Sequence, residues 1–308
     1  MTAGGVSLPE LPEPAVRLES TPIGAPAAAR GRLTIDGTTV IGLVGVVLVG
    51  GLILTAILAP FLAPYDPRER VGIPFQRPSA LYPLGTNDIG QDLLSELIYG
   101  ARVSLTVGIV AATVALIIGT TVGVLAGFYR RIVGSVLMRF VDILLIIPFL
   151  PLLIVLAAYL GRSLLNTILI IGVLIWAATA RVIRSQVLSL TQRDYIRAAR
   201  ALGASDARII GRHILPRVLL LGISQFVQAT SGAILLEASL SFLGLGDPLQ
   251  KSWGSILYWA QVRGAFLTDA WLWWVLPPGL LIGAAALGFA LMGFALEQRI
   301  NPQLRSGR

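Results

Sequence analysis

The sequence predicts an all-α integral membrane protein with six transmembrane helices, and three observations lead to this fold class. Apolar residues make up 55% of the 308 residues and charged residues only 13%, roughly half the charged share of a soluble domain. Six apolar stretches are long enough to cross a bilayer, since a spanning helix needs about 20 residues. Most lysines and arginines cluster between these stretches, as they do where charge sets the orientation of a membrane protein.

The two ends of the chain fall outside the predicted membrane domain. Residues 1–35 are rich in proline, alanine and glutamate and contain no apolar core of a cleaved signal peptide. We therefore expect a disordered cytoplasmic tail over 1–35, a membrane domain over 36–300 and a short cytoplasmic tail over 301–308.

Each apolar stretch predicts one spanning helix. The expected spans cover residues 40–62, 103–129, 136–160, 164–188, 218–243 and 273–296. Only Gly161, Arg162 and Ser163 separate the third span from the fourth. These two spans should therefore form a tight helical hairpin.

Positive charge is distributed unequally between the two sides of the predicted bilayer. Segments on the side of the N-terminus carry 17 lysines and arginines, and segments on the other side carry 7. Cytoplasmic segments are enriched in these residues. Both termini are therefore expected in the cytoplasm, and the chain is expected to be a multi-pass protein of the plasma (inner) membrane.

Two loops on the outer side are long enough to hold structure of their own. The first, residues 63–102, contains five prolines that favour an extended chain. Its later part, residues 88–99, has apolar and acidic faces at helical spacing, which is typical of a helix lying flat on the membrane. The second, residues 244–271, carries four tryptophan and tyrosine residues, for which an interfacial belt is favoured over ligand stacking. They are Trp253, Tyr258, Trp259 and Trp271.

The connection between the fourth and fifth spans, residues 191–216, predicts two short helices outside the membrane. A helix over 195–202 has one apolar face and one basic face at 100° per residue. Gly203 ends it in a left-handed conformation, Ser205 caps a second helix over 206–213, and Pro216 stops that helix before the fifth span. The apolar face consists of Tyr195, Ala198, Ala199 and Leu202, and the basic face of Arg193, Arg197 and Arg200.

The chemistry of this alanine-rich face fits two roles about equally well. It could pack against the protein's own helix ends, or it could seat in the groove of another protein, where small side chains allow close approach. His213, the only histidine, fits a charge at a helix C-terminus better than a catalytic group.

Two carboxylates fall inside the predicted spans, where an unpartnered charge is costly. For Asp142 we favour a local ion pair with Arg139, three residues earlier. For Glu237, near the outer end of the fifth span, we favour a structural or gating contact over a substrate ligand.

Several function classes are excluded or disfavoured by composition. The absence of cysteine and the single histidine argue against a metal centre. No phosphate-binding loop is present, and the arginines form no broad basic face mixed with aromatic residues, as a nucleic-acid site would. The spans contain no paired Asp, Ser–His or His-rich motif of an intramembrane enzyme. A self-contained, ion-coupled secondary transporter is the alternative function, although it would need an internal repeat and carboxylates near the bilayer midplane.

Residues 191–216 resemble the cytoplasmic coupling loop of ABC importer permeases. The family pattern is Glu-Ala-Ala, three residues and Gly, followed by a spacer and a stretch ending in Leu-Pro; here it reads RAARALG over 197–203 and HILP over 213–216. Three more stretches resemble the dipeptide and oligopeptide branch of these permeases, and together they span the chain from about residue 40 to its end. They are residues 84–105, 237–246 and 252–254.

The resemblance implies a type I importer permease fold with a cytoplasmic coupling helix, and a non-catalytic role in importing peptides or a related small solute. It implies a homologous second permease, two ATPase subunits that hold ATP and magnesium, an extracytoplasmic substrate-binding protein and surrounding lipid, with no nucleic acid. The family's glutamate is replaced by Arg197, which implies a compensating acidic residue in the ATPase. The ATPase-coupling residues are expected to be Tyr195, Arg197, Ala198, Ala199, Leu202, Gly203, Leu215 and Pro216.

Overall fold

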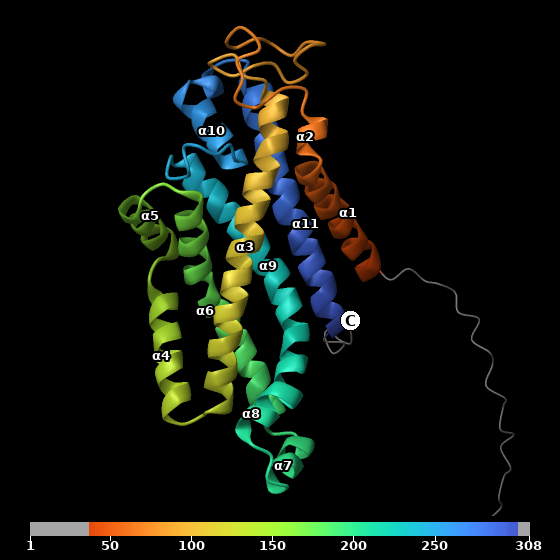
Figure 1. Ribbon diagram of the computed structural model, residues 1–308, viewed down its shortest axis with the longest axis vertical. Coiled ribbons are helices and arrows are strands. Elements are labelled where there is room, and N and C mark those ends of the chain that lie inside the picture. Colours follow the sequence, from red (N-terminus) through yellow and green to blue (C-terminus); the bar gives the residue numbers. More distant parts are fainter. Residues whose placement is uncertain (1–36, 301–308) are drawn as a thin grey trace, which may run out of the picture. The chain divides into compact units, whose positions relative to one another are not determined.

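The computed structural model describes residues 37–300, which form helices and connecting loops without any β-strand (Figure 1). The predicted tails over 1–35 and 301–308 lie outside these residues. The α-helices are α1 (Gly37–Ile57), α2 (Ala59–Leu62), α3 (Leu93–Phe128), α4 (Ile132–Ile146), α5 (Phe149–Leu160), α6 (Leu164–Leu190), α7 (Asp194–Ala201), α8 (Asp206–Ile209), α9 (Leu215–Phe242), α10 (Trp253–Val262) and α11 (Leu276–Ile300). Two π-helical turns, Ile210–Ile214 and Trp271–Val275, directly precede α9 and α11.

Five helices are long and apolar enough to cross a membrane, and a sixth span results if α4 and α5 are counted together. The chain is therefore a multi-pass membrane protein of the all-α class that the sequence predicts. The third span differs from a straight helix, because α4 and α5 meet at an angle of 89°. Pro148 lies between them, and proline interrupts helical hydrogen bonding and disfavours a helical residue before it.

Helices α3 and α6 pack closely along a row of three glycines on α3 that are four residues apart. A Cβ atom added at Gly119, Gly123 or Gly127 would lie 2.7–2.8 Å from a side-chain carbon of α6. Small residues at this spacing let two helix backbones approach closely, which is a common way for helices to associate in a bilayer. The α6 residues that would be met are Thr179, Ile183 and Val187.

The predicted surface helix over 88–99 is wrong. Asp92 caps α3, its carboxylate accepting from the Ser95 N–H at 2.8 Å, and α3 then continues for 36 residues without a break. The reason is that Leu93 and Leu97 bury themselves in the same core as the following turns. The acidic face is covered by protein loops rather than by lipid headgroups, since Glu96 is only 2% exposed.

Pro216 also behaves differently from the prediction. It does not stop the second short helix, because α8, the π-turn and α9 form one helical run over Asp206–Phe242. The N–H of Leu215 donates to the carbonyl of Ile210, five residues earlier. This wider turn lets the chain absorb proline's missing N–H while the helix continues.

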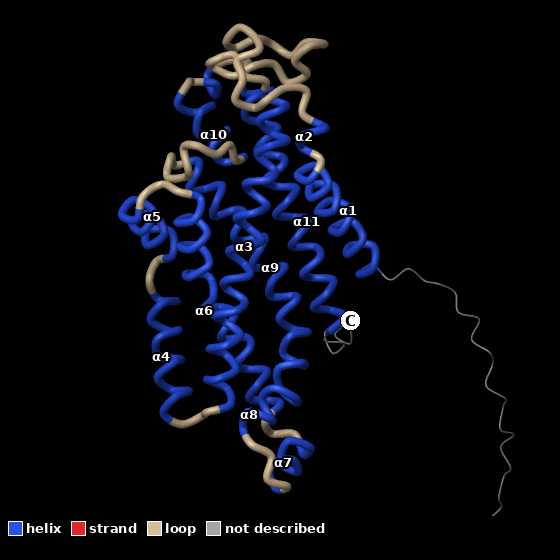
Figure 2. The backbone as a smooth tube through the Cα atoms, viewed as in Figure 1, coloured by secondary structure: helices blue, strands red, loops and turns tan. Residues whose placement is uncertain are grey.

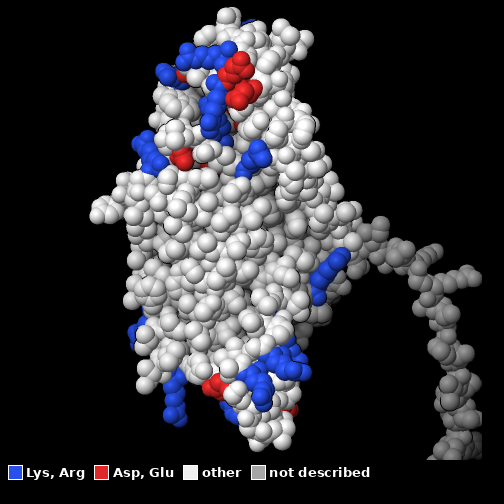
Figure 3. Space-filling view, in the orientation of Figure 1, with Lys and Arg blue, Asp and Glu red and all other residues white. Residues whose placement is uncertain are grey.

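The polar parts of the molecule gather at its two ends. The long loops and α10 lie at one end, and α7 and α8 lie at the opposite end (Figures 1 and 2). On the face seen in Figure 3, lysine, arginine and acidic side chains cluster at both ends and leave the side of the bundle between them almost free of charge. Such a band is the expected outer surface of a protein that spans a bilayer.

Candidate functional site

The connection over 191–216 forms a compact projection at the α7 end of the molecule. Helix α7 runs over Asp194–Ala201, and Gly203 follows it with φ of +79°, the left-handed conformation predicted for it. The N–H of Ala204 donates to the carbonyl of Ala199 at 3.0 Å, which closes the end of the helix. Ser205 then caps α8, as expected, by accepting from the Arg208 N–H.

One apolar side chain fixes α7 to the membrane helices. Ile196 is 1% exposed, and it packs in a cluster with the ends of α3 and α6 and with the start of α9. Any displacement of α7 must therefore move these three helices or unpack Ile196. The buried members of the cluster are Val124, Phe128, Ile183, Val187, Leu190, Ile196, Ile209, Ile214 and Val218.

Two residues of the predicted apolar face of α7 pack partly against the protein, and the other two are exposed to solvent. Tyr195 is half-buried and lies under the Arg217 guanidinium, 4.3 Å from the ring centroid. Ala199 is also half-buried, whereas Ala198 and Leu202 are exposed, Leu202 by 88%. This face is thus partly buried against the protein's own helices and partly exposed.

Ile196 is the residue that sequence reasoning missed at this site. The helical projection grouped residues into an alanine face and an arginine face, and Ile196 falls between them. Its signal was the presence of a large β-branched residue beside Tyr195, in a helix whose other residues are aspartate, arginine and alanine.

At 100° per residue, the arginines of α7 project from the side of the helix opposite Leu202. Arg197 is 70% exposed and its nearest carboxylate is Asp194 at 3.8 Å, itself completely exposed. Arg200 lies over the Phe128 ring, 5.5 Å from its centroid. Leu215 is half-buried and Pro216 is exposed in the first turn of α9. Both residues therefore belong to α9 and are not part of α7.

Each of the two carboxylates within the spans contacts a side chain of a neighbouring helix. Asp142 pairs with Arg181 of α6 at 2.6 Å, so the predicted pair with Arg139 is wrong. Asp142 points from α4 toward α6, whereas Arg139 is on the exposed side of α4. Glu237 is 2% exposed and accepts from Ser104 of α3 at 2.9 Å and from Ser241 at 2.7 Å.

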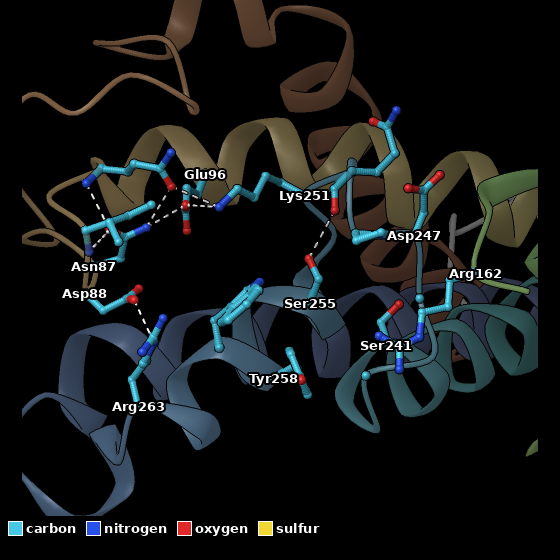
Figure 4. A pocket seen from close by; sticks show the side chains of 17 residues that line it. Asn87, Asp88, Glu96, Arg162, Ser241, Asp247, Lys251, Ser255, Tyr258 and Arg263 are labelled. Atoms are coloured by element: carbon cyan, nitrogen blue, oxygen red, sulfur yellow. Dashed lines mark hydrogen bonds and ion pairs between the residues drawn. The ribbon is translucent and has the colours of Figure 1, made fainter. Parts of the chain in front are cut away.

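At the α10 end, several polar side chains form a largely buried hydrogen-bond network. Lys251 donates to Glu96 at 2.7 Å and to Gln91 at 3.0 Å, and Asn87 donates to both of those acceptors at 2.9 Å. These residues line one wall of a cleft, shown in Figure 4. The sequence offered one signal for this network, since Lys251 is the only lysine of the chain.

Trp253 is not part of an interfacial belt. It is fully buried, and its indole N–H donates to the Leu97 carbonyl at 3.1 Å. It joins α10 to α3, so the predicted belt at this loop holds at most for the exposed Trp259 and Trp271 and the half-buried Tyr258. Within residues 37–300, no group of three or more His, Asp or Glu side chains could hold a metal ion.

Comparison with known proteins identifies two family matches along the chain. Residues 119–306 match the binding-protein-dependent transport system inner membrane component, and residues 40–81 match the N-terminal transmembrane domain of oligopeptide transport permease C. The first match includes the α7 projection, and the second covers most of α1 and part of the loop that follows it.

Curated relatives are similar over most of their length. A dipeptide transport system permease protein of Alkalihalophilus pseudofirmus is 39% identical over 275 residues, 86% of this chain and 87% of the relative. A di/tripeptide transport system permease protein of Pseudomonas aeruginosa is 38% identical, with 83% and 86% covered. A glutathione transport system permease protein of Pectobacterium atrosepticum is 34% identical, with 83% and 84% covered.

Proposed function

The chain belongs to the family of binding-protein-dependent transport system inner membrane components, and on this premise we propose that it is the membrane subunit of an ATP-driven peptide importer. It forms half of a translocation path whose other half is a homologous permease. The relatives named for dipeptides, di- and tripeptides and glutathione support short peptides as the substrate class. A self-contained secondary transporter has no such support.

The α7 projection is the proposed contact with the ATPase subunits. The observation that carries this assignment is the exposure of Ala198 and Leu202 on a helix whose other side is anchored by Ile196. An exposed apolar patch on a short helix whose other faces carry arginines fits a groove with an acidic rim. Two ATPase subunits would hold ATP and magnesium, and their closure would be transmitted through Ile196 to α3, α6 and α9.

The proposed orientation follows from this contact. With ATPases at the α7 end, that end lies in the cytoplasm together with both termini, in agreement with the excess of positive charge on that side. The α10 end then faces outward, where a substrate-binding protein delivers peptide.

The test enlarges a residue that has free space in the isolated chain. Ala198→Leu adds three carbons at an exposed position, so the subunit should fold normally while the ATPase groove becomes overpacked by about 1–3 kcal/mol. We expect recovery of the ATPase subunits in a pull-down to fall about tenfold, the factor that 1.4 kcal/mol gives, and ATP-dependent peptide uptake to fall with it.

Ala178→Leu supplies the matched control, because Ala178 is exposed on α6 within a predicted span, far along the chain from the projection. This variant should retain both ATPase recovery and uptake. Unchanged recovery and unchanged uptake in Ala198→Leu would refute the docking role of α7.

A further inference from the structure

A cleft of about 370 Å³ opens at the α10 end of the molecule, and its walls come from four separate segments of the chain. They are the loop and first turn of α3, the hairpin between α5 and α6, the end of α9 with its following loop, and α10 (Figure 4). Its volume lies in the range of small-molecule sites.

The cleft contains three acidic and three basic side chains, but they are not equally engaged. Lys251 is paired with Glu96 at 2.7 Å, and Arg263 is paired with Asp88 at 2.7 Å. The carboxylate of Asp247 accepts from the N–H groups of Leu164 at 3.0 Å and Leu249 at 2.8 Å. Five of the six charges are therefore committed to the structure of the wall. They are Asp88, Glu96, Asp247, Lys251 and Arg263.

Arg162 is the sixth charge. Its side chain lines the cleft and has no ion pair or hydrogen bond with any residue between 37 and 300. It is exposed, so a guanidinium with all five N–H donors available faces the cleft. The wall without Arg162 carries one net negative charge, from three carboxylates and two cations, and Arg162 adds the one positive charge of the cleft that has no partner among residues 37–300.

The backbone beneath Arg162 is held firmly. Gly161 has φ of +87°, which lets the chain turn sharply between α5 and α6. The side-chain amide of Asn166 donates to the carbonyls of Leu160 at 2.7 Å and Gly161 at 3.1 Å, and Ser163 caps α6. The turn therefore displays Arg162 from a fixed position, which lowers the entropy lost on binding.

We infer that this cleft is an entry site for peptide on the outer side of the subunit, in which Arg162 binds the C-terminal carboxylate. The inference rests on the proposed function. A guanidinium and a carboxylate match as a planar two-bond pair, and every unmodified peptide carries this carboxylate whatever its side chains. The wall next to it supplies amide and hydroxyl groups for the peptide backbone and two aromatic faces for apolar side chains; these residues are Gln250, Ser255, Tyr258 and Trp259.

The test compares trialanine with trialanine amide, which lacks the terminal charge. ATP-driven uptake of each is measured in proteoliposomes containing the whole complex at saturating binding protein, and the ratio of the two rates is recorded. The same binding protein delivers both peptides to every variant, so its own selectivity cancels when ratios are compared. In Arg162→Gln we expect the preference for trialanine to fall about tenfold, equivalent to 1.4 kcal/mol.

Two further variants separate carboxylate binding from a structural effect. Arg162→Lys keeps the charge but loses the planar fork, so it should retain part of the preference. Arg70→Gln removes an exposed arginine of the same end that does not line the cleft, and it should leave the ratio unchanged. An unchanged ratio in Arg162→Gln would overturn the inference. This is the result expected if Arg162 contacted only anionic lipid headgroups.

Direct binding decides the case in which Arg162→Gln loses uptake of both peptides. Trialanine binding to the purified complex without binding protein is then compared between the wild type and this variant. Weaker binding of trialanine, with no change for its amide, supports the site, and equal binding refutes it. A wild-type complex that imports neither peptide would refute the proposed peptide import, while this binding measurement would still judge the carboxylate site.

Discussion

Two ion pairs, one at each polar end of the protein, use charge in opposite ways. At the α10 end, Lys251 and Glu96 pair at 2.7 Å with side chains only 24% and 2% exposed. At the α7 end, Arg197 lies 3.8 Å from Asp194, and their side chains are 70% and 100% exposed. The first pair is enclosed by the protein, whereas the second faces solvent.

This difference separates charges that hold the fold from charges available to a partner. A buried pair cannot lose one member without leaving the other uncompensated, so the α10 end depends on its polar network. Exposed pairs contribute little to stability, so the arginines of α7 are free for recognition. Arg162 at the α10 end differs from Lys251, because it faces the cleft without a partner among the described residues.

The largest expected effect comes from breaking the closed end. Lys251→Met should strand the Glu96 carboxylate in a site that is 2% exposed and destabilise the subunit by about 3 kcal/mol, the lower end of the range for a buried pair. The lower end applies because the Lys251 side chain is 24% exposed, so water can reach that side of the pair. The measurement is the thermal midpoint of the purified permease pair in detergent.

A second substitution distinguishes this effect from lost packing. Adding Glu96→Gln to Lys251→Met removes the stranded charge while keeping an acceptor for Asn87, and it should recover most of the lost stability. If the double variant is no more stable than the single one, the pair is not what holds this end together.

The next effect should show that a change at the α7 end impairs ATPase binding, whereas a change at the α10 end impairs stability. Gly203→Val forces a β-branched residue into a left-handed conformation at a cost of roughly 1–2 kcal/mol, at a position where an added Cβ meets nothing within 4 Å. We expect the α7 turn to rearrange and ATPase recovery to fall about tenfold, while the thermal midpoint of the spans stays close to that of the wild type.

Gly50→Val is the matched control for this variant. Gly50 is exposed on α1, and an added Cβ there also has open space, but its backbone is helical. Normal ATPase recovery in Gly203→Val would contradict the importance of the α7 turn. A collapse of the thermal midpoint would show instead that the turn belongs to the fold.

Local features of both ends could be predicted from the sequence, and contacts between distant segments could not. The left-handed Gly203 and the Ser205 cap depend on neighbouring residues and were correct. The Lys251–Glu96 pair joins residues 155 positions apart, and nothing in a single sequence relates them. The flat helix over 88–99 failed for the same reason, because its acidic face is covered by residues from this distant loop.

Two further errors arose where local rules were overridden by packing. Pro216 was expected to stop a helix, but the π-turn before it carries the chain through into α9. Asp142 was paired with Arg139 by sequence spacing, yet α6 supplies Arg181 on the side that Asp142 faces. The coupling role of Ala198 and Leu202 stays a prediction, and the sequence did not identify the buried Ile196 that fixes α7 to the membrane helices.

The smallest expected effect concerns Arg197, where the family pattern has glutamate. Arg197→Glu places a carboxylate beside Asp194, three residues earlier, and reverses the charge offered to the ATPase. If the partner groove carries a compensating acidic residue, restoring the family residue should weaken ATPase recovery, by less than Gly203→Val does, and the loss should shrink as salt screens the repulsion. Arg197→Gln, which removes the charge without reversing it, should fall between the wild type and Arg197→Glu. The measurement is ATPase recovery across a series of salt concentrations. Stronger recovery in Arg197→Glu would show that the partner has not adapted to arginine, and the open charge at this end would then be tolerated rather than used.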